Sequence, residues 1–184
     1  MDAYVYLQVK PGTMHEVLAG ITSNSQAHRA IAVVGAWDVM MHVEGPDLVT
    51  IATQVLSEIH HVPGIVRTLT APVVPPDRIG IAGWVTPKAP AIIGDACYVH
   101  IRAEAGAAAG IAERLGEMTD LVSGVAVLGG EYDLMVCVAQ AWEVASGVIL
   151  EKIQPLPGVI STDTLISIAY EEPEDDRDQF SAWT

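Results

Sequence analysis

The sequence has little positive charge. Its 184 residues include only nine lysines and arginines against 23 aspartates and glutamates, which gives a formal net charge of −14. Proteins bind nucleic-acid backbones largely through lysine and arginine side chains that displace counterions, and anionic membrane surfaces attract basic segments in the same way. We therefore expect no direct binding of nucleic acid and no association with a membrane.

Cysteines, long apolar runs and targeting signals are also scarce. The chain has two cysteines, Cys97 and Cys137, and no C-x-x-C motif, which is typical of a reducing compartment without a disulfide framework. No apolar stretch reaches the roughly 18 residues that span a bilayer, and the N-terminal residues lack the basic and apolar regions of a signal peptide. Together these features predict a cytoplasmic protein.

The common signatures of catalysis and cofactor binding are missing as well. The glycines show neither the G-x-G-x-x-G nor the Walker spacing of phosphate-binding loops. No Ser-His-Asp or Cys-His set stands out in the sequence, and no acidic or histidine residues have recognisable metal-ligand spacing. We therefore expect no catalytic residues, no cofactor and no metal site.

The chain is rich in apolar residues and in internal repetition. Hydrophobic residues make up 51% of the chain and charged residues 17%, which is enough apolar material for a buried core. Four landmarks recur in the same order at an offset of about 94 residues, the pattern expected of a tandem repeat. The matches are Tyr4-Val5 with Tyr98-Val99, Pro11-Gly12 with Ala105-Gly106, Gly35-Ala36-Trp37-Asp38 with Gly130-Glu131-Tyr132-Asp133, and Val62-Pro63-Gly64-Ile65 with Leu156-Pro157-Gly158-Val159.

Each copy has the pattern of a ferredoxin-like βαββαβ unit, with helices on one face of an antiparallel sheet. In the first copy, Thr13 and Glu16 predict a capping box for the first helix, and Pro46 and Asp47 open the second. The expected strands are residues 4–10, 29–34, 38–44 and 65–74 in the first copy, and 97–104, 122–128, 132–138 and 159–170 in the second, where helices are expected over 107–118 and 142–153.

These patterns predict four segments. Residues 1–74 form the first repeat, and residues 75–95 form a linker whose prolines favour an extended strap. Residues 96–170 form the second repeat. Residues 171–184 form an acidic, solvated tail.

Strand alternation predicts which side chains face away from the helices. The set comprises Tyr4, Tyr6, Gln8, Asp38, Met40 and His42 in the first copy, and Tyr98, His100, Arg102, Asp133, Met135 and Cys137 in the second. This face is too apolar to remain in water, so two such faces should meet. We expect an α+β barrel of the dimeric type, formed by both copies of one chain, with exchange between chains as the alternative. Cys97 falls on the helix side, so no disulfide to Cys137 is expected.

The Gly-x-aromatic-Asp turn and the Pro-Gly-[Ile/Val]…Thr-x-Thr ending, in this element order, resemble the effector-binding (RAM) module of the Lrp/AsnC regulators. The best match is residues 127–134, followed by Leu156-Pro157-Gly158-Val159 and Thr162-Asp163-Thr164. The resemblance implies a barrel that assembles into homo-oligomers and senses amino acids or related small molecules between barrels. Family members also carry a DNA-binding helix-turn-helix, for which this sequence has no residues. Any regulation of transcription would therefore need a protein partner.

The resemblance also implies a ligand-binding site. In the second copy, the matching residues are Gly130, Tyr132 and Asp133 in the loop, with Leu165, Ile166 and Ser167 in the later strand. In the first copy, the loop gives Gly35, Trp37 and Asp38, whereas the later strand reads Ala71-Pro72-Val73 and departs from the family pattern.

The chemistry of these residues suits a zwitterionic ligand. A glycine with positive φ allows a tight turn whose exposed amides suit a carboxylate, and the aspartate can accept hydrogen bonds from an ammonium group. The alternative is that Asp38 and Asp133 only stabilise their turns, as aspartate often does.

Two other functions remain open. Dimeric α/β barrels also host enzymes, such as monooxygenases and haem proteins, in which Tyr6, His42, Tyr98 and His100 would surround a substrate inside the barrel. The chain could also be an oligomerisation module without a ligand. The leading hypothesis is a non-enzymatic small-molecule sensor.

Overall fold

The computed structural model describes residues 1–23, 29–75, 92 and 94–168. Most of the predicted linker and the whole acidic tail lie outside these residues. The first half contains β1 (Asp2–Val9), α1 (Met14–Thr22), β2 (Arg29–Val34), β3 (Val39–Glu44), α2 (Leu48–Ser57), a 3-10 turn (Ile59–His61) and β4 (Ile65–Val74). The second half contains β5 (Cys97–Ala103), α3 (Ala108–Gly116), β6 (Gly124–Leu128), β7 (Leu134–Val138), α4 (Trp142–Val148), a π-helical turn (Ile149–Ile153) and β8 (Val159–Ile168).

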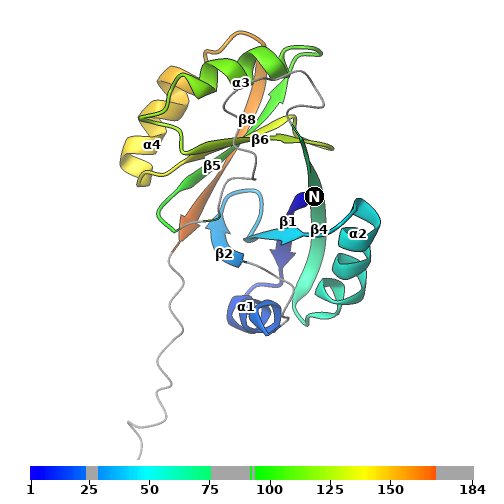
Figure 1. The fold of residues 1–184 in the computed structure, drawn as a ribbon. Coiled ribbons are helices and arrows are strands. Elements are labelled where there is room, and N and C mark those ends of the chain that lie inside the picture. The colour runs from blue at the N-terminus through cyan, green and yellow to red at the C-terminus, as the bar shows by residue number, and fades with distance from the viewer. Residues whose placement is uncertain (24–28, 76–91, 93, 169–184) are drawn as a thin grey trace, which may run out of the picture.

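The eight strands form one closed antiparallel barrel in the order β1-β3-β2-β8-β5-β7-β6-β4. Two seams join the halves of the chain, because β2 pairs with β8 and β4 pairs with β6. The helices lie on the outside, α1 and α2 against the first half and α3 and α4 against the second (Figure 1). The predicted α+β class and barrel type are therefore confirmed, and the predicted strand ends are correct to within two residues.

Strand alternation divides the apolar side chains into three cores. Two cores lie between the strands and the helices, where Val5 and Leu7 pack against α1 and α2 in the first half. The third fills the barrel and contains the inward side chains of Tyr4, Tyr6, Met40, Tyr98, Met135 and Cys137. Cys97 belongs to the helix-side core of the second half, and both cysteines are free thiols, as the strand phase predicts.

The helix starts differ from the sequence prediction at one point. Thr13 forms no side-chain cap on α1, and its hydroxyl instead donates to the carbonyl of Lys10 at 2.8 Å. The predicted capping box is therefore wrong, because Thr13 has φ −111° and ψ 14° rather than the extended backbone of a capping residue. Asp47 does cap α2, since its carboxylate accepts a 2.8 Å hydrogen bond from the Thr50 amide.

The described helices are too short, or too polar, to cross a lipid bilayer.

Candidate functional site

The polar centre of the barrel is a hydrogen bond between Tyr6 and His100. Tyr6 lies on β1 and His100 at the matching position of β5, since Tyr6 pairs with Met40 and His100 pairs with Met135 in the neighbouring strands. The hydroxyl of Tyr6 and Nε2 of His100 are 2.7 Å apart, and the two rings meet edge to face at 4.9 Å between centroids. Both side chains are buried.

Burial keeps this pair uncharged. Desolvation lowers the pKa of His100 to about 4 and raises the pKa of Tyr6 well above its usual value. A general acid or base works best when its pKa is near the working pH. At neutral pH, neither group of this pair is therefore adjusted for proton transfer, and the bond joins the two halves of the barrel.

Two loop aromatics extend this cluster toward one end of the barrel. Trp37, between β2 and β3, and Tyr132, between β6 and β7, are only 5% and 4% exposed. The Trp37 ring lies 6.0 Å from that of Tyr6, and the Tyr132 ring lies 4.7 Å from that of His100. The two Gly-x-aromatic-Asp loops thus each add one ring to the same interior core.

An arginine covers each of these rings. The Arg67 guanidinium carbon lies 5.1 Å from the centroid of Trp37, and that of Arg102 lies 4.6 Å from the centroid of Tyr132, both within cation–π range. Arg67 comes from β4 and Arg102 from β5. The two arginines therefore lie on non-equivalent strands of their halves. Arg67 pairs with Gln8 of β1, whereas Arg102 pairs with Ser161 of β8.

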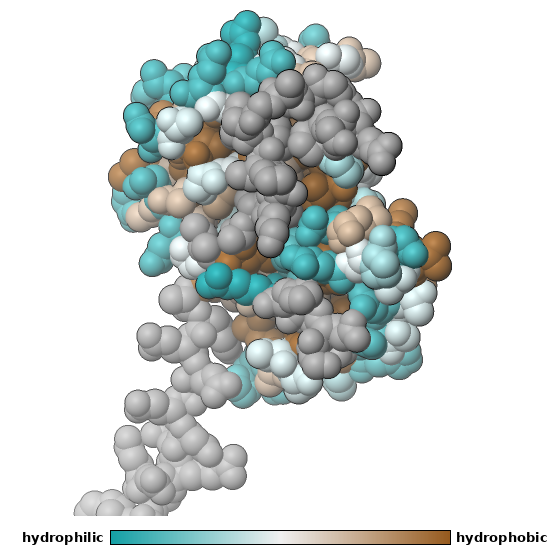
Figure 2. Space-filling model, viewed as in Figure 1, coloured by the Kyte–Doolittle hydropathy of each residue, from teal (hydrophilic) through white to brown (hydrophobic). Residues whose placement is uncertain are grey.

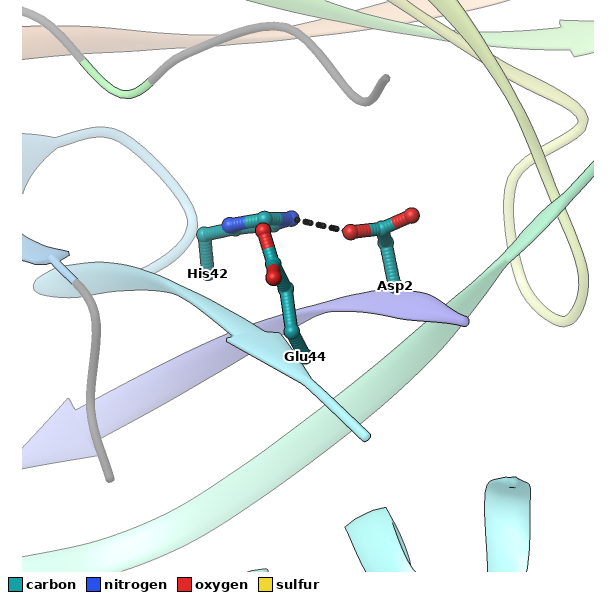
Figure 3. A group of neighbouring side chains, drawn as sticks. All are labelled: Asp2, His42 and Glu44. Atoms are coloured by element: carbon teal, nitrogen blue, oxygen red, sulfur yellow. Dashed lines mark ion pairs between the residues drawn. The ribbon is translucent and has the colours of Figure 1, made fainter. Parts of the chain in front are cut away.

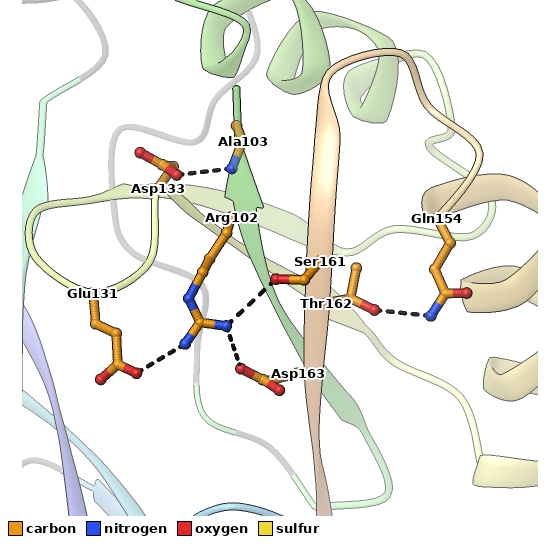
Figure 4. Close-up of polar contacts among 8 residues, drawn as sticks. All are labelled: Arg102, Ala103, Glu131, Asp133, Gln154, Ser161, Thr162 and Asp163. Atoms are coloured by element: carbon orange, nitrogen blue, oxygen red, sulfur yellow. Dashed lines mark hydrogen bonds and ion pairs between the residues drawn. The ribbon is translucent and has the colours of Figure 1, made fainter. Parts of the chain in front are cut away.

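The two arginines differ in their polar partners. Arg102 donates to Asp163 and Glu131 at 2.8 Å each, and to Ser161 at 3.4 Å (Figure 4). Within the described part of the chain, Arg67 makes neither a hydrogen bond nor an ion pair, and its guanidinium lies over the Trp37 ring. Arg102 is thus neutralised by carboxylates, whereas no described carboxylate neutralises Arg67.

The two predicted aspartates have backbone partners. Asp38 accepts a hydrogen bond from the Val9 amide at 2.9 Å, and Asp133 accepts one from the Ala103 amide at 2.8 Å (Figure 4). Both amides lie where the strand register shifts, after Gln8 in β1 and after Arg102 in β5. These bonds favour the structural interpretation of the aspartates, and a role in ligand binding stays a prediction.

The remaining predicted residues fall into two groups. Trp37, Tyr132 and Leu165 share the barrel core, and Gly35 lies against β8, where an added Cβ would be 2.6 Å from the Thr164 carbonyl oxygen. The others lie apart. Ile166 packs on the helix side, the Ser167 hydroxyl bonds the backbone of Ala96, and Gly130 has open space around it.

Sequence reasoning missed Arg67. This residue lines a surface pocket of about 330 Å³ together with His60, Ile65, Val66 and Thr68. It shares the strand phase of Leu69, which packs against the barrel core. That phase was the available signal, because it directs Arg67 to the inward face, where the loop aromatics also pack.

No protein-family model and no curated protein matches the chain. Among solved structures, the siroheme decarboxylase NirDL matches with a TM-score of 0.66 at 10% identity, over 92% of this chain and 71% of that chain. AsnC of E. coli matches with a TM-score of 0.37 at 20% identity, over 68% of this chain and 71% of AsnC. A hypothetical protein from Pyrococcus horikoshii matches with a TM-score of 0.35 at 23% identity, over 38% of this chain and 83% of that protein. The NirDL likeness supports the barrel fold, whereas the other two TM-scores are too low to support it further.

Proposed function

We propose that the protein is a non-enzymatic small-molecule sensor whose ligand is an amino acid or a related carboxylate. The observation that carries this proposal is the difference between the two arginines. Arg102 is held by Glu131 and Asp163, whereas the described residues offer no polar partner to Arg67, whose guanidinium lies over buried Trp37.

The chemistry around Arg67 suits a carboxylate. A guanidinium presents a planar fork of donors that matches a carboxylate in a bidentate pair. Trp37 supports the guanidinium from one side. Arg67 also lines a surface pocket of about 330 Å³ with its neighbours on β4 and with His60, a volume within the range of small-ligand sites. We propose that this end of the barrel is the primary site, and that Gly130, Tyr132 and Asp133 form a second, weaker site because Glu131 and Asp163 compete for Arg102.

The same proposal includes a duplicated Lrp/AsnC-like effector module. Its support is the shared element order of the two halves and the cation–aromatic pair in each. We also propose a homo-oligomer, because hydrophobic side chains are exposed over α2 and α4 (Figure 2), including Val49 and Trp142. Light scattering tests the oligomer, and a monomer would contradict it. A cytoplasmic location and a protein partner stay predictions.

The second candidate is an enzyme that uses the barrel interior. Its support is the fold likeness to NirDL, a siroheme decarboxylase, together with the buried Tyr6 and His100 pair. Two observations favour the sensor instead, namely the apolar packing of the barrel core and the uncharged state of the pair. An absorbance spectrum of the purified protein that shows a bound tetrapyrrole or flavin would favour the enzyme.

A thermal-shift screen of the amino acids and their keto acids tests the sensor. A ligand at 100 times its Kd should raise the melting temperature by about 5 to 10 °C. Arg67→Gln should remove most of this shift, whereas Arg102→Gln should retain it, and Arg114→Gln on α3 is the control. Absence of any shift across the set would contradict the proposal.

A further inference from the structure

We propose that Asp2, His42 and Glu44 form a binding site for one divalent transition-metal ion. The three side chains come from β1 and β3, at the opposite end of β1 from the loop aromatics. Their ligand atoms all lie within 4.8 Å of one another, and Figure 3 shows the imidazole beside both carboxylates. This inference is independent of the proposed sensor function.

Strand pairing brings the three residues together. Asp2 lies directly opposite Glu44, and His42 lies two residues along β3, opposite Tyr4. Because strand side chains alternate, all three share the inward phase of Tyr4 and Met40. Paired strands hold ligands more rigidly than loops do, so little movement is needed for the three groups to converge.

The imidazole of His42 is placed as a ligand. Its Nε2 atom is buried and makes no hydrogen bond within the part of the chain that is described, although it lies 3.2 Å from Oδ1 of Asp2. Metal–ligand bonds of about 2.1 Å in a tetrahedral site place neighbouring ligand atoms roughly 3.4 Å apart. The two atoms therefore already have the separation of two ligands on one ion.

The negative charges of Asp2 and Glu44 also favour a bound cation. Like charges directly opposite each other on antiparallel strands are destabilising, and Asp2 and Glu44 are such a pair. A divalent ion would neutralise both. One imidazole nitrogen and two carboxylate oxygens suit Zn²⁺ and its neighbours in the first transition row, and three protein ligands leave a position for water.

The second half of the barrel provides an internal comparison. There, Tyr98 pairs with Cys137 where Tyr4 pairs with His42. The positions that correspond to Asp2 and Glu44 hold Ala96 and Ala139. Neither corresponding position carries a carboxylate, and both lie just outside β5 and β7, so we expect one ion per chain. Glu44→Ala introduces the residue that stands directly after β7 in the second half.

The test is calorimetric titration of tag-free, chelator-treated full chain with Zn²⁺, supported by visible absorption spectra with Co²⁺. We expect one equivalent of Zn²⁺ per chain, with at least tenfold weaker binding in His42→Gln and in Glu44→Ala. His61→Gln, which removes an exposed histidine, should bind as the unaltered chain does. Circular dichroism of each variant shows whether the fold is retained.

Two results would overturn the site. One is no saturable binding at one equivalent. The other is unchanged affinity in both ligand variants, which would mean that Zn²⁺ binds elsewhere and that His42 and Asp2 form only an ion pair. If a variant fails to fold, the His42 imidazole signals in NMR spectra of the unaltered chain decide instead. They should shift at one equivalent of Zn²⁺, and their failure to move would reject the proposal.

Discussion

The hydroxyl of Tyr6 and Nε2 of His100, which lie 94 residues apart in the sequence, form a 2.7 Å hydrogen bond inside the barrel. Each residue holds the same place on the central strand of its half. The bond therefore crosses between the halves at the point where their inward faces meet. Both groups are fully enclosed there, so the loss of either partner should affect stability.

The first prediction concerns the strength of this bond. Tyr6→Phe leaves a buried imidazole nitrogen without its partner, which should lower the free energy of unfolding by about 1 to 3 kcal/mol. In a double-mutant cycle with His100→Gln, denaturant unfolding should give a coupling energy of at least roughly 0.5 kcal/mol. Additive effects would contradict the contact.

The second prediction is an acid-dependent loss of stability from His100. Its pKa is about 4 in the folded protein against 6.5 for an exposed histidine. Between these values the unfolded chain binds the proton and the folded chain does not, so stability falls as the pH falls through this window. The loss from this residue should be on the order of 3 kcal/mol in total, and no further loss is expected from it below its folded pKa.

Unfolding curves measured from neutral pH down to about pH 4 check this effect. Carboxylates also titrate at the acid end, so the comparison is between chains. The free energy of unfolding should fall less steeply with falling pH in His100→Gln than in the unaltered chain, and equally steeply in His61→Gln. Equal slopes in the His100→Gln variant and the unaltered chain would show that His100 is protonated in the folded protein.

The third prediction compares two glycines in corresponding loops. Gly35 and Gly130 both have positive φ, 151° and 121°, so alanine is strained at either position. Only at Gly35 would the added Cβ also clash, at 2.6 Å from the Thr164 carbonyl oxygen and 2.7 Å from Leu165. Gly35→Ala should therefore lower the melting temperature clearly more than Gly130→Ala. Equal losses would indicate that β2 and β8 do not meet there.

The fourth prediction concerns the thiols. Cys97 and Cys137 are buried in different cores, and burial raises the pKa of both. Because the thiolate is the reactive form, both thiols should react slowly with a disulfide reagent in the native protein and rapidly in denaturant. A disulfide between them, detected by mass spectrometry without reduction, would contradict the strand phase.

The strand period accounts for what the sequence predicted well. A two-residue alternation directs Tyr6, Met40, Tyr98 and Met135 to the face opposite the helices, and these side chains fill the barrel. The same period places Cys97 on the other face. These assignments need no knowledge of long-range structure, since each strand fixes its own faces.

The contacts that depend on how the strands pair to close the barrel could not be predicted from the sequence. Asp2 and His42 are 40 residues apart, and only the register of β1 and β3 brings their side chains within 3.2 Å. The partners of Arg102 likewise come from a loop and from β8, so its difference from Arg67 has no local signal. The prediction of a capping box at Thr13 was wrong for a different reason. A capping residue needs an extended backbone, which the sequence motif alone does not guarantee.

The most direct test of the sensor proposal is the indole signal of Trp37 in ¹H–¹⁵N NMR spectra, assigned with Trp37→Phe, during titration with the amino acid that gives the largest thermal shift. We expect a saturable shift of this signal, abolished in Arg67→Gln and retained in Arg114→Gln. An unchanged Trp37 signal at ligand saturation, or the same affinity in Arg67→Gln, would contradict a carboxylate site at this end of the barrel.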